Sequence, residues 1–143
     1  MLYTPMTKKA MDICFEAHKE QKDKSGQPYV FHPFHLAEQM ETEDTVIVAL
    51  LHDTIEDTDV TLEYLAKEGF SPSVLDAIAL MTHAPGVDYM AYVAEIKKNP
   101  IAKAVKIADL THNSTLSRLN EITPKDRERV KRYKDALTLL TTD

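Results

Sequence analysis

The run of apolar residues from Val46 to Leu51 constrains the fold of this chain more than any other feature. A helix formed by this run has no polar face, so it must be surrounded by other helices. Hydrophobic periodicity alone would also allow a buried strand. However, the run continues into His52-Asp53-Thr54-Ile55-Glu56-Asp57 without a turn residue. The sequence therefore predicts a central helix over residues 44–57.

The remaining sequence predicts further helices and no sheet. Thr4-Pro5, Ser71-Pro72 and Thr123-Pro124 each place an N-cap residue before a proline at the first helical position. The chain has only three glycines in 143 residues, whereas β-hairpins use glycine heavily. No repeat or linker divides the sequence, so we expect a single compact all-α bundle over residues 1–143. The expected helices span residues 5–20, 33–41, 44–57, 61–68, 72–82, 88–98, 101–119 and 124–140.

Charge and composition exclude several classes of protein. The formal net charge is −6, which disfavours binding to a nucleic-acid backbone, although a local basic cluster or a metal ion could still bind a small phosphorylated ligand. Cys14 is the only cysteine and cannot form an internal disulfide. Because no signal peptide and no apolar stretch of membrane-spanning length is found, we expect a cytoplasmic protein without membrane contact. The sequence leaves its oligomeric state open.

Four ionisable residues, His52, Asp53, Glu56 and Asp57, directly follow the most apolar stretch of the chain. Charges beside a buried segment must be paired, solvated in a cleft or bound to a metal ion. On a continuous helix His52 would lie over Glu56, and Asp53 over Asp57. His52 and Asp53 could then bind one ion, with the two other carboxylates one turn away. The alternative is a helix end with solvated acids.

Two further segments contribute candidate metal ligands. Asp109 is a lone carboxylate in an apolar helical stretch, with Asn113 one turn further along. His32 directly precedes Pro33 at the expected start of a helix. Imidazole and carboxylate ligands together suit Mn²⁺ or Fe²⁺, with Zn²⁺, Co²⁺ and Mg²⁺ less favoured. The absence of thiolates in this set disfavours a structural zinc site.

These residues belong to an ordered series of motifs that covers residues 17–113. The chain resembles the HD-domain phosphohydrolases, and among them the hydrolase domain of the bifunctional RelA/SpoT alarmone enzymes and the stand-alone small alarmone hydrolases. The motifs that carry the resemblance are Ala17-His18, Lys24-Ser25-Gly26, Pro28-Tyr29, His32-Pro33, His52-Asp53, Glu56-Asp57, Lys106-Ile107-Ala108-Asp109 and His112-Asn113.

The resemblance implies an all-α fold and one Mn²⁺ ion per chain. The residues that match the family's metal ligands are His32, His52, Asp53 and Asp109. The pair Glu56-Asp57 matches the residues that activate the attacking water. The implied activity is guanosine-3′,5′-bis(diphosphate) 3′-pyrophosphohydrolase, on a small phosphorylated nucleotide. The synthetase domain of the long enzymes has no room in this chain.

Several residues are candidates for contact with the substrate. Lys24 and Ser25 lie in a polar loop and are expected to contact phosphate, although Ser25-Gly26 would also form an ordinary turn. Asn113 and His18 are further candidates, with capping or packing as their alternative roles. His35 and His83 are expected to be structural, and the charged run over residues 125–134 is expected to be a solvated face.

Asp23 departs from the pattern of the family. An arginine usually stands at this position and holds the guanine base, and a carboxylate cannot make the same cation–π contact. We therefore expect the reaction type to be retained and base recognition to be altered. Two alternatives stay open, a hydrolase of another nucleotide or phosphate ester and a catalytically idle nucleotide-binding sensor.

Overall fold

The computed structural model describes all 143 residues and confirms an all-α fold. The one β feature is an isolated bridge between Lys22 and Pro28. The helices are α1 (Pro5–His18), α2 (Phe31–Glu38), α3 (Glu43–Leu51), α4 (Thr54–Asp57), α5 (Leu62–Lys67), α6 (Pro72–Met81), α7 (Tyr89–Lys97), α8 (Pro100–Asn113), the 3₁₀ helix η1 (Leu116–Arg118) and α9 (Pro124–Thr141).

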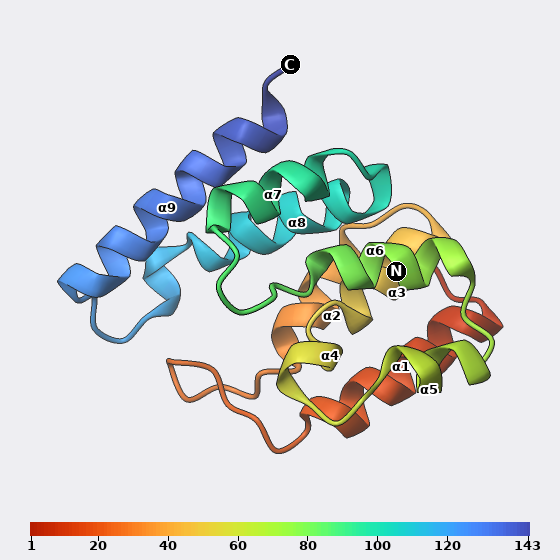
Figure 1. Cartoon of the computed structure of the whole chain (residues 1–143). Coiled ribbons are helices and arrows are strands. Elements are labelled where there is room, and N and C mark those ends of the chain that lie inside the picture. The colour runs from red at the N-terminus through yellow and green to blue at the C-terminus, as the bar shows by residue number, and fades with distance from the viewer.

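Helix α3 lies at the centre of the hydrophobic core, as its sequence predicts. Every residue from Val46 to Leu51 is at most 2% exposed. Helices α1, α2, α6 and α8 all pack against α3 (Figure 1). Because each fully buried Leu or Ile side chain contributes about 1.5–3 kcal/mol, this helix fixes the positions of its neighbours.

The helix starts follow the expected capping chemistry. The side chains of Thr4, Ser71 and Thr123 each accept a hydrogen bond from a backbone amide in the first turn of the helix that follows. Thr42 caps α3 in the same way, through a capping box with Thr45. These caps satisfy amides that would otherwise have no partner inside the helix.

The single helix expected over residues 44–57 is wrong, because the structure divides it into α3 and α4 at His52-Asp53. The imidazole Nδ1 of His52 is hydrogen-bonded to the carbonyl of Ala49 at 2.7 Å. The hydroxyl of Thr54 donates to the carbonyl of Leu51 at 2.8 Å. Side chains thus occupy backbone acceptors at this point, and the chain changes direction before α4 begins.

Two other segments frame the region around this break. Helix α9 packs on α7 and α8 and extends past them, while the loop over residues 19–30 lies across from the start of α9 (Figure 1). The side-chain amide of Asn120 donates to the carbonyl of Ser25 at 3.2 Å and ties the two segments together. The helix expected over residues 101–119 ends at Asn113, and η1 connects it towards α9. None of the helices combines the length and the apolar character that crossing a bilayer requires.

Candidate metal centre and active-site cleft

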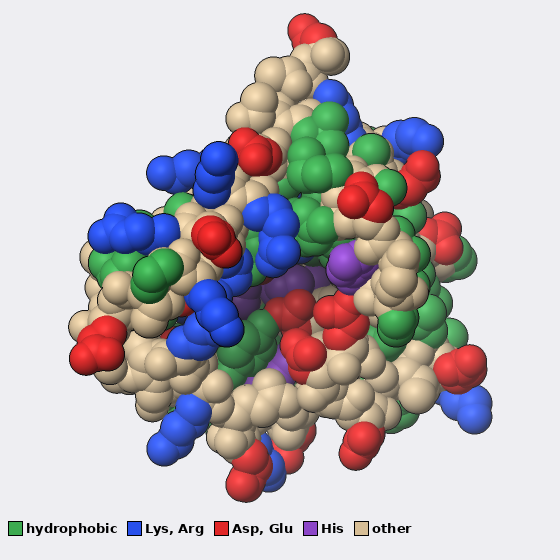
Figure 2. Space-filling view, turned by 60° about the vertical axis from the view of Figure 1, so that its left-hand side comes forward, with side chains coloured by type: hydrophobic (Ala, Val, Ile, Leu, Met, Phe, Trp, Pro, Cys, Tyr) green, Lys and Arg blue, Asp and Glu red, His purple; other side chains and the backbone are tan.

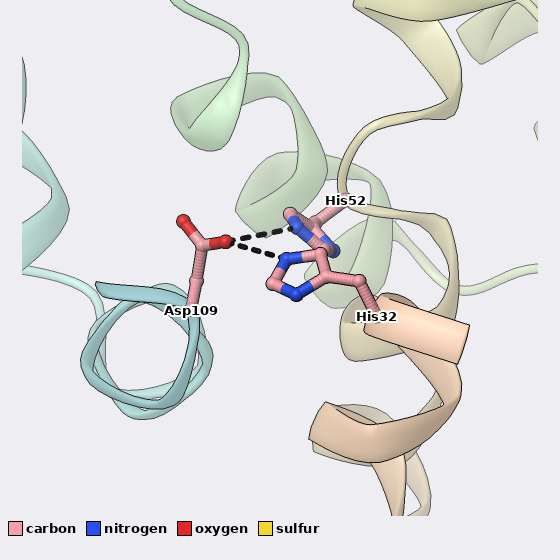
Figure 3. A group of neighbouring side chains, drawn as sticks. All are labelled: His32, His52 and Asp109. Carbon is pink, nitrogen blue, oxygen red and sulfur yellow. Dashed lines mark hydrogen bonds and ion pairs between the residues drawn. The ribbon is translucent and has the colours of Figure 1, made fainter. Parts of the chain in front are cut away.

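Three ionisable side chains from distant parts of the chain converge between α2, α3 and α8. His32 lies in the first turn of α2, His52 follows the last residue of α3, and Asp109 lies on α8. Their possible ligand atoms all lie within 4.8 Å of one another. Asp109 Oδ1 is 2.8 Å from His32 Nε2 and 3.6 Å from His52 Nε2 (Figure 3). All three residues are buried, so their charges must compensate one another or bind a cation.

The environment of His52 fits a metal ligand. Its Nδ1 donates to the carbonyl of Ala49, so in the neutral ring Nε2 carries a lone pair. This Nε2 is buried and makes no hydrogen bond, although Asp53 Oδ2 is 3.1 Å away and Asp109 Oδ1 is 3.6 Å away. A lone pair facing two carboxylates is unfavourable, so this nitrogen needs a proton or a metal cation between it and the carboxylates. Burial alone would lower the pKa of His52, but the two carboxylates raise it well above its ordinary value.

Asp53, the fourth expected ligand, lies beside the three converging residues and is not part of their group. Its Oδ2 accepts a hydrogen bond from the hydroxyl of Tyr29. Burial tends to raise the pKa of Asp53, but the neighbouring His52 holds it below its ordinary value. The carboxylate is therefore ionised and directed towards the same nitrogen of His52 as Asp109.

Asp109 is the carboxylate of the centre whose negative charge has the most polar partners. Its Oδ2 is 3.0 Å from the ammonium group of Lys106, which is also buried. Its Oδ1 accepts a hydrogen bond from the side-chain amide of Asn113 at 3.1 Å. Burial would raise the pKa of Asp109, but Lys106 and the two imidazoles lower it well below its ordinary value. This residue remains a carboxylate under all ordinary conditions.

Glu56 and Asp57 lie on α4 at the exposed edge of the centre. Glu56 accepts a hydrogen bond from the backbone amide of His83, which fixes its carboxylate against the loop after α6. Burial of part of each side chain raises the pKa of both carboxyl groups above their ordinary values. The backbone of His83 thus holds Glu56 in place, which agrees with a structural role for this residue.

A cleft of two adjoining cavities opens beside the three converging residues His32, His52 and Asp109. The first, of about 370 Å³, contains Asp53, Glu56, Asp57 and Asp109 among its lining residues. The second, of about 330 Å³, is lined by Lys22, Lys24, Arg118 and Arg129 among others. Three residues, Tyr29, Asn113 and Tyr133, line both cavities. The cleft is therefore acidic at one end and basic at the other.

The surface view shows the same division of charge. Acidic side chains and histidines lie in the floor of a hollow, with Lys and Arg side chains gathered along one side of it (Figure 2). A larger groove of about 920 Å³ between α1 and α5 contains none of the three converging residues. The hollow with both charges is therefore the stronger candidate for an active site.

Of the expected substrate contacts, three lie in the cleft and one does not. Lys24 and Ser25 line its basic cavity, and Asn113 lines both cavities. His18 is completely buried and lines neither of them. Its Nδ1 is 2.9 Å from Gln21 Oε1 and its ring lies 5.0 Å from the ring of Tyr29. His18 thus packs against Tyr29, a residue that lines both cavities, and is not itself part of their lining.

Three residues of α9 that the sequence did not single out as functional belong to the cleft. Arg129, Arg132 and Tyr133 line it, although the charged run that contains them was expected to be a solvated face. The guanidinium of Arg132 lies 5.0 Å from the ring centre of Tyr89. The spacing of Arg129 and Tyr133, one helical turn apart, was the available signal, since it places both on one face of a helix.

Asp23 has a local structural task in the loop over residues 19–30. Its Oδ1 accepts hydrogen bonds from the amide and hydroxyl of Ser25 and from the amide of Gln27, at 2.7–3.0 Å. Its Oδ2 lies 3.7 Å from the guanidinium of Arg118. Slight burial tends to raise the pKa of Asp23, but the hydrogen bonds from Ser25 and Gln27 lower it. The carboxylate thus shapes the loop that carries Lys24 and Ser25.

Comparison with known proteins places the chain among HD-domain proteins. A model of the family described as HD domain matches residues 10–136. The human guanosine-3′,5′-bis(diphosphate) 3′-pyrophosphohydrolase MESH1 is 34% identical over 139 residues, which cover 87% of this chain and 76% of that protein. The enzyme of the same name from Haemophilus influenzae is 33% identical over 133 residues, covering 82% of this chain and 19% of the relative.

Other relatives differ in length or in sequence. The Aquifex aeolicus guanosine-3′,5′-bis(diphosphate) 3′-pyrophosphohydrolase is 41% identical over 91 residues, which are 61% of this chain and 13% of the relative. The chain thus spans less than a fifth of the length of these bacterial relatives. A solved structure, from work on a metazoan ortholog of SpoT that hydrolyzes ppGpp, superposes with a TM-score of 0.77 at 21% identity. The superposition covers 99% of this chain and 88% of that one, and it shows a shared fold.

Proposed function

Since the chain belongs to the HD-domain family, we propose that it is a metal-dependent phosphohydrolase that removes pyrophosphate from the 3′ position of guanosine 3′,5′-bis(diphosphate). The observation that carries the proposal is the cleft itself, in which the converging His and Asp ligands adjoin a basic cavity. This nucleotide carries one diphosphate on the 3′ oxygen and one on the 5′ oxygen of its ribose. The metal centre can act on the first while the basic cavity binds the second. The activity for which the human and bacterial relatives are named supports the same substrate.

In this proposal His32, His52 and Asp109 bind the metal ion, and Asp53 completes the set beside them. The fit rests on the unpartnered Nε2 of His52 between two carboxylates. The mixture of two imidazoles and two carboxylates favours Mn²⁺ among the common divalent ions. Such an ion, when bound, polarises a phosphoryl oxygen and lowers the pKa of a bound water.

Glu56 and Asp57 are proposed to handle the proton of the attacking water. Both line the metal end of the cleft without belonging to the converging ligand group. Water attacks the phosphorus joined to the ribose 3′ oxygen, the bond between that phosphorus and the 3′ oxygen breaks, and a carboxylate of this pair takes the water proton. The 3′ oxygen leaves and is protonated, so the products are guanosine diphosphate and pyrophosphate. A carboxyl group with a raised pKa is a stronger base for this step than an ordinary one.

The basic cavity is proposed to bind the phosphates at the other end of the nucleotide. Lys24, Arg118 and Arg129 bring positive charge to one side of it. Arginine suits this task because its planar guanidinium binds phosphate through two parallel hydrogen bonds. Asp23 lies in the same cavity and opposes an anion there, which favours a second candidate, hydrolysis of a phosphate ester with less charge at this end.

The test is hydrolysis by the purified full chain, with Mn²⁺ and after metal removal, across guanosine 3′,5′-bis(diphosphate), common nucleotides and simple phosphate esters. We expect guanosine diphosphate and pyrophosphate in equal amounts, separated by anion-exchange chromatography. Lack of hydrolysis of every substrate with every divalent ion would instead support a nucleotide-binding sensor. Hydrolysis of a different substrate alone would replace the proposed one.

A double variant, Glu56→Gln with Asp57→Asn, tests the proposed catalytic pair. We expect kcat to fall by about 10²–10⁴-fold, since general-base catalysis contributes an amount of that order. Metal content should stay at the wild-type level because neither residue belongs to the converging group. The matched control is Asp59→Asn, which removes a nearby carboxylate that lines the groove between α1 and α5 and not the cleft. Unchanged kcat in the double variant would remove the pair from the mechanism.

A further inference from the structure

We propose that His112 is a positioning residue for the metal centre, because its Nδ1 accepts the Nδ1–H of His32 and leaves Nε2 of His32 to bind the ion. The inference rests on the proposed metal site and adds to it a residue that makes no contact with the ion. Its evidence is the contact between the two rings, and it does not depend on the identity of the nucleotide.

The two imidazoles are joined through one nitrogen each. His32 Nδ1 and His112 Nδ1 are 2.7 Å apart in a hydrogen bond. The ring planes differ by 6° and the ring centres are 4.9 Å apart. With the nitrogens so close and the centres so far apart, the rings lie edge to edge in a common plane. This is the arrangement in which an N–H of one ring points along the lone pair of the other.

The positions of the ring protons decide which nitrogen of His32 is free to bind the ion. His32 Nε2 is 2.8 Å from Asp109 Oδ1, and when Nε2 of the neutral ring donates to this carboxylate, Nδ1 accepts from His112. When Nε2 binds a cation it carries no proton, and the one proton of the neutral ring must stand on Nδ1. His32 then donates and His112 accepts, with the proton of His112 on its Nε2. The pair holds two ring protons in both states, so the exchange is balanced.

His112 is the one residue that forms a hydrogen bond with Nδ1 of His32. His32 is 3% exposed, and the hydrogen bonds of its ring are with Asp109 and His112 alone. The ring of His112 packs against His35, with ring centres 4.2 Å apart. Arg118 donates to the backbone carbonyl of His112 at 3.0 Å and fixes the last turn of α8. Helix α8 therefore supplies Asp109 and, one turn later, the group that orients His32.

Such outer partners of metal-binding histidines matter to affinity. They fix the tautomer and the orientation of the ring, and their removal costs about 10–100-fold in metal affinity. In most sites the partner is a carboxylate, a backbone carbonyl or a water. A second imidazole can both donate and accept, so it can serve His32 with or without the ion.

Three variants test the role by their affinity for Mn²⁺ alone, measured by competition with a chelating dye and without any nucleotide. His112→Phe keeps a ring in place but offers no acceptor, so we expect binding to weaken about 10–100-fold. His112→Asn places its Oδ1 where the imidazole has Nδ1, and it should recover most of the affinity. His35→Phe is the packing control, since it keeps a ring against His112 and should bind Mn²⁺ as the unmodified protein does.

A merely structural role for His112 would give a different pattern. It would lower the melting temperature in the presence of a chelator without separating Phe from Asn in Mn²⁺ affinity. Wild-type affinity in His112→Phe, or equal weakening in His112→Asn, would overturn the proposal. Because no nucleotide is used, these results are independent of whether guanosine 3′,5′-bis(diphosphate) is the substrate.

Nuclear magnetic resonance of the unmodified protein, labelled with ¹⁵N in histidine and loaded with diamagnetic Zn²⁺, decides the matter even if His112→Phe does not fold. We expect His32 to carry its proton on Nδ1 and a scalar coupling between its Nδ1 and that of His112. A proton on Nε2 of His32, or no coupling between the two nitrogens, would refute the assignment.

Discussion

Replacement of Lys106 by methionine should destabilise the metal-free protein and increase its response to metal. The ammonium group of Lys106 is 3.0 Å from Asp109 Oδ2, and both residues are at most 9% exposed. Burial alone would lower the pKa of Lys106, but the Asp109 carboxylate and the nearby Tyr92 raise it. Methionine fills a similar volume and removes the charge, so Asp109 loses its strongest cationic partner.

The expected loss follows from the remaining contacts of Asp109. Removal of one member of a buried ion pair costs about 3–5 kcal/mol. Since Asp109 keeps His32 at 2.8 Å and Asn113 at 3.1 Å, the lower end, about 3 kcal/mol, applies. Unfolding of a chain of this length has an entropy of about 0.3 kcal/mol/K near its midpoint, so the melting temperature should fall by about 10 °C.

The assay is thermal unfolding followed by circular dichroism, with a chelator and then with saturating Mn²⁺. A bound cation restores positive charge beside Asp109, so the rise in melting temperature on adding Mn²⁺ should be larger for Lys106→Met than for the wild type. Lys103→Met, one turn earlier on α8 at a lysine without an ion pair, is the matched control. A melting temperature of Lys106→Met equal to that of the wild type in chelator would refute the reasoning.

Three further predictions concern stability alone. Leu50→Ala removes a side chain that is 0% exposed at the centre of the core. It should lower the free energy of unfolding, measured by urea denaturation, by about 2–5 kcal/mol. A loss below about 1 kcal/mol would mean that the core around α3 repacks to fill the space. Thr123→Ala removes the N-cap of α9 and should lower the free energy of unfolding by about 1 kcal/mol. An unchanged midpoint of urea denaturation would show that this cap does not stabilise the protein. Hydrogen bonds from Thr123, together with Arg129, lower the pKa of Asp126 to about 2, below its ordinary value. The stabilisation by Asp126 is therefore complete above about pH 4 and is lost as the pH falls towards about 2, so Asp126→Asn should lose less stability over that range than the wild type.

The sequence by itself determined the fold class and which residue types the candidate centre contains. The apolar run Val46–Leu51 predicted a central helix because a helix without a polar face has to be enclosed. The threonines and serine before prolines predicted helix starts because capping is a local interaction within one turn. The candidate ligands His32, His52 and Asp109 were identifiable from their residue types and from the polar character that sets them apart from apolar neighbours.

Local pattern was misleading where side chains compete with the backbone. The stretch after Leu51 has no turn residue, yet His52 and Thr54 bind backbone carbonyls and end the helix. In the same way the residue type of Asp23 indicates only the loss of a cationic side chain, whereas the structure shows that its carboxylate organises the loop around Ser25. Such side-chain contacts depend on rotamers and on loop geometry, which periodicity does not encode.

Only the tertiary structure decided which distant residues meet. His32 contacts Asp109 across 77 positions and His112 across 80, while α9 brings Arg129 and Tyr133 to the cleft beside the loop over residues 19–30. These encounters are set by how α2, α8 and α9 pack around α3, and the crossing of helices depends on the fit of many side chains at once. The sequence specifies the chemical groups one segment at a time, and packing alone brings an imidazole of α8 within hydrogen-bonding distance of one on α2.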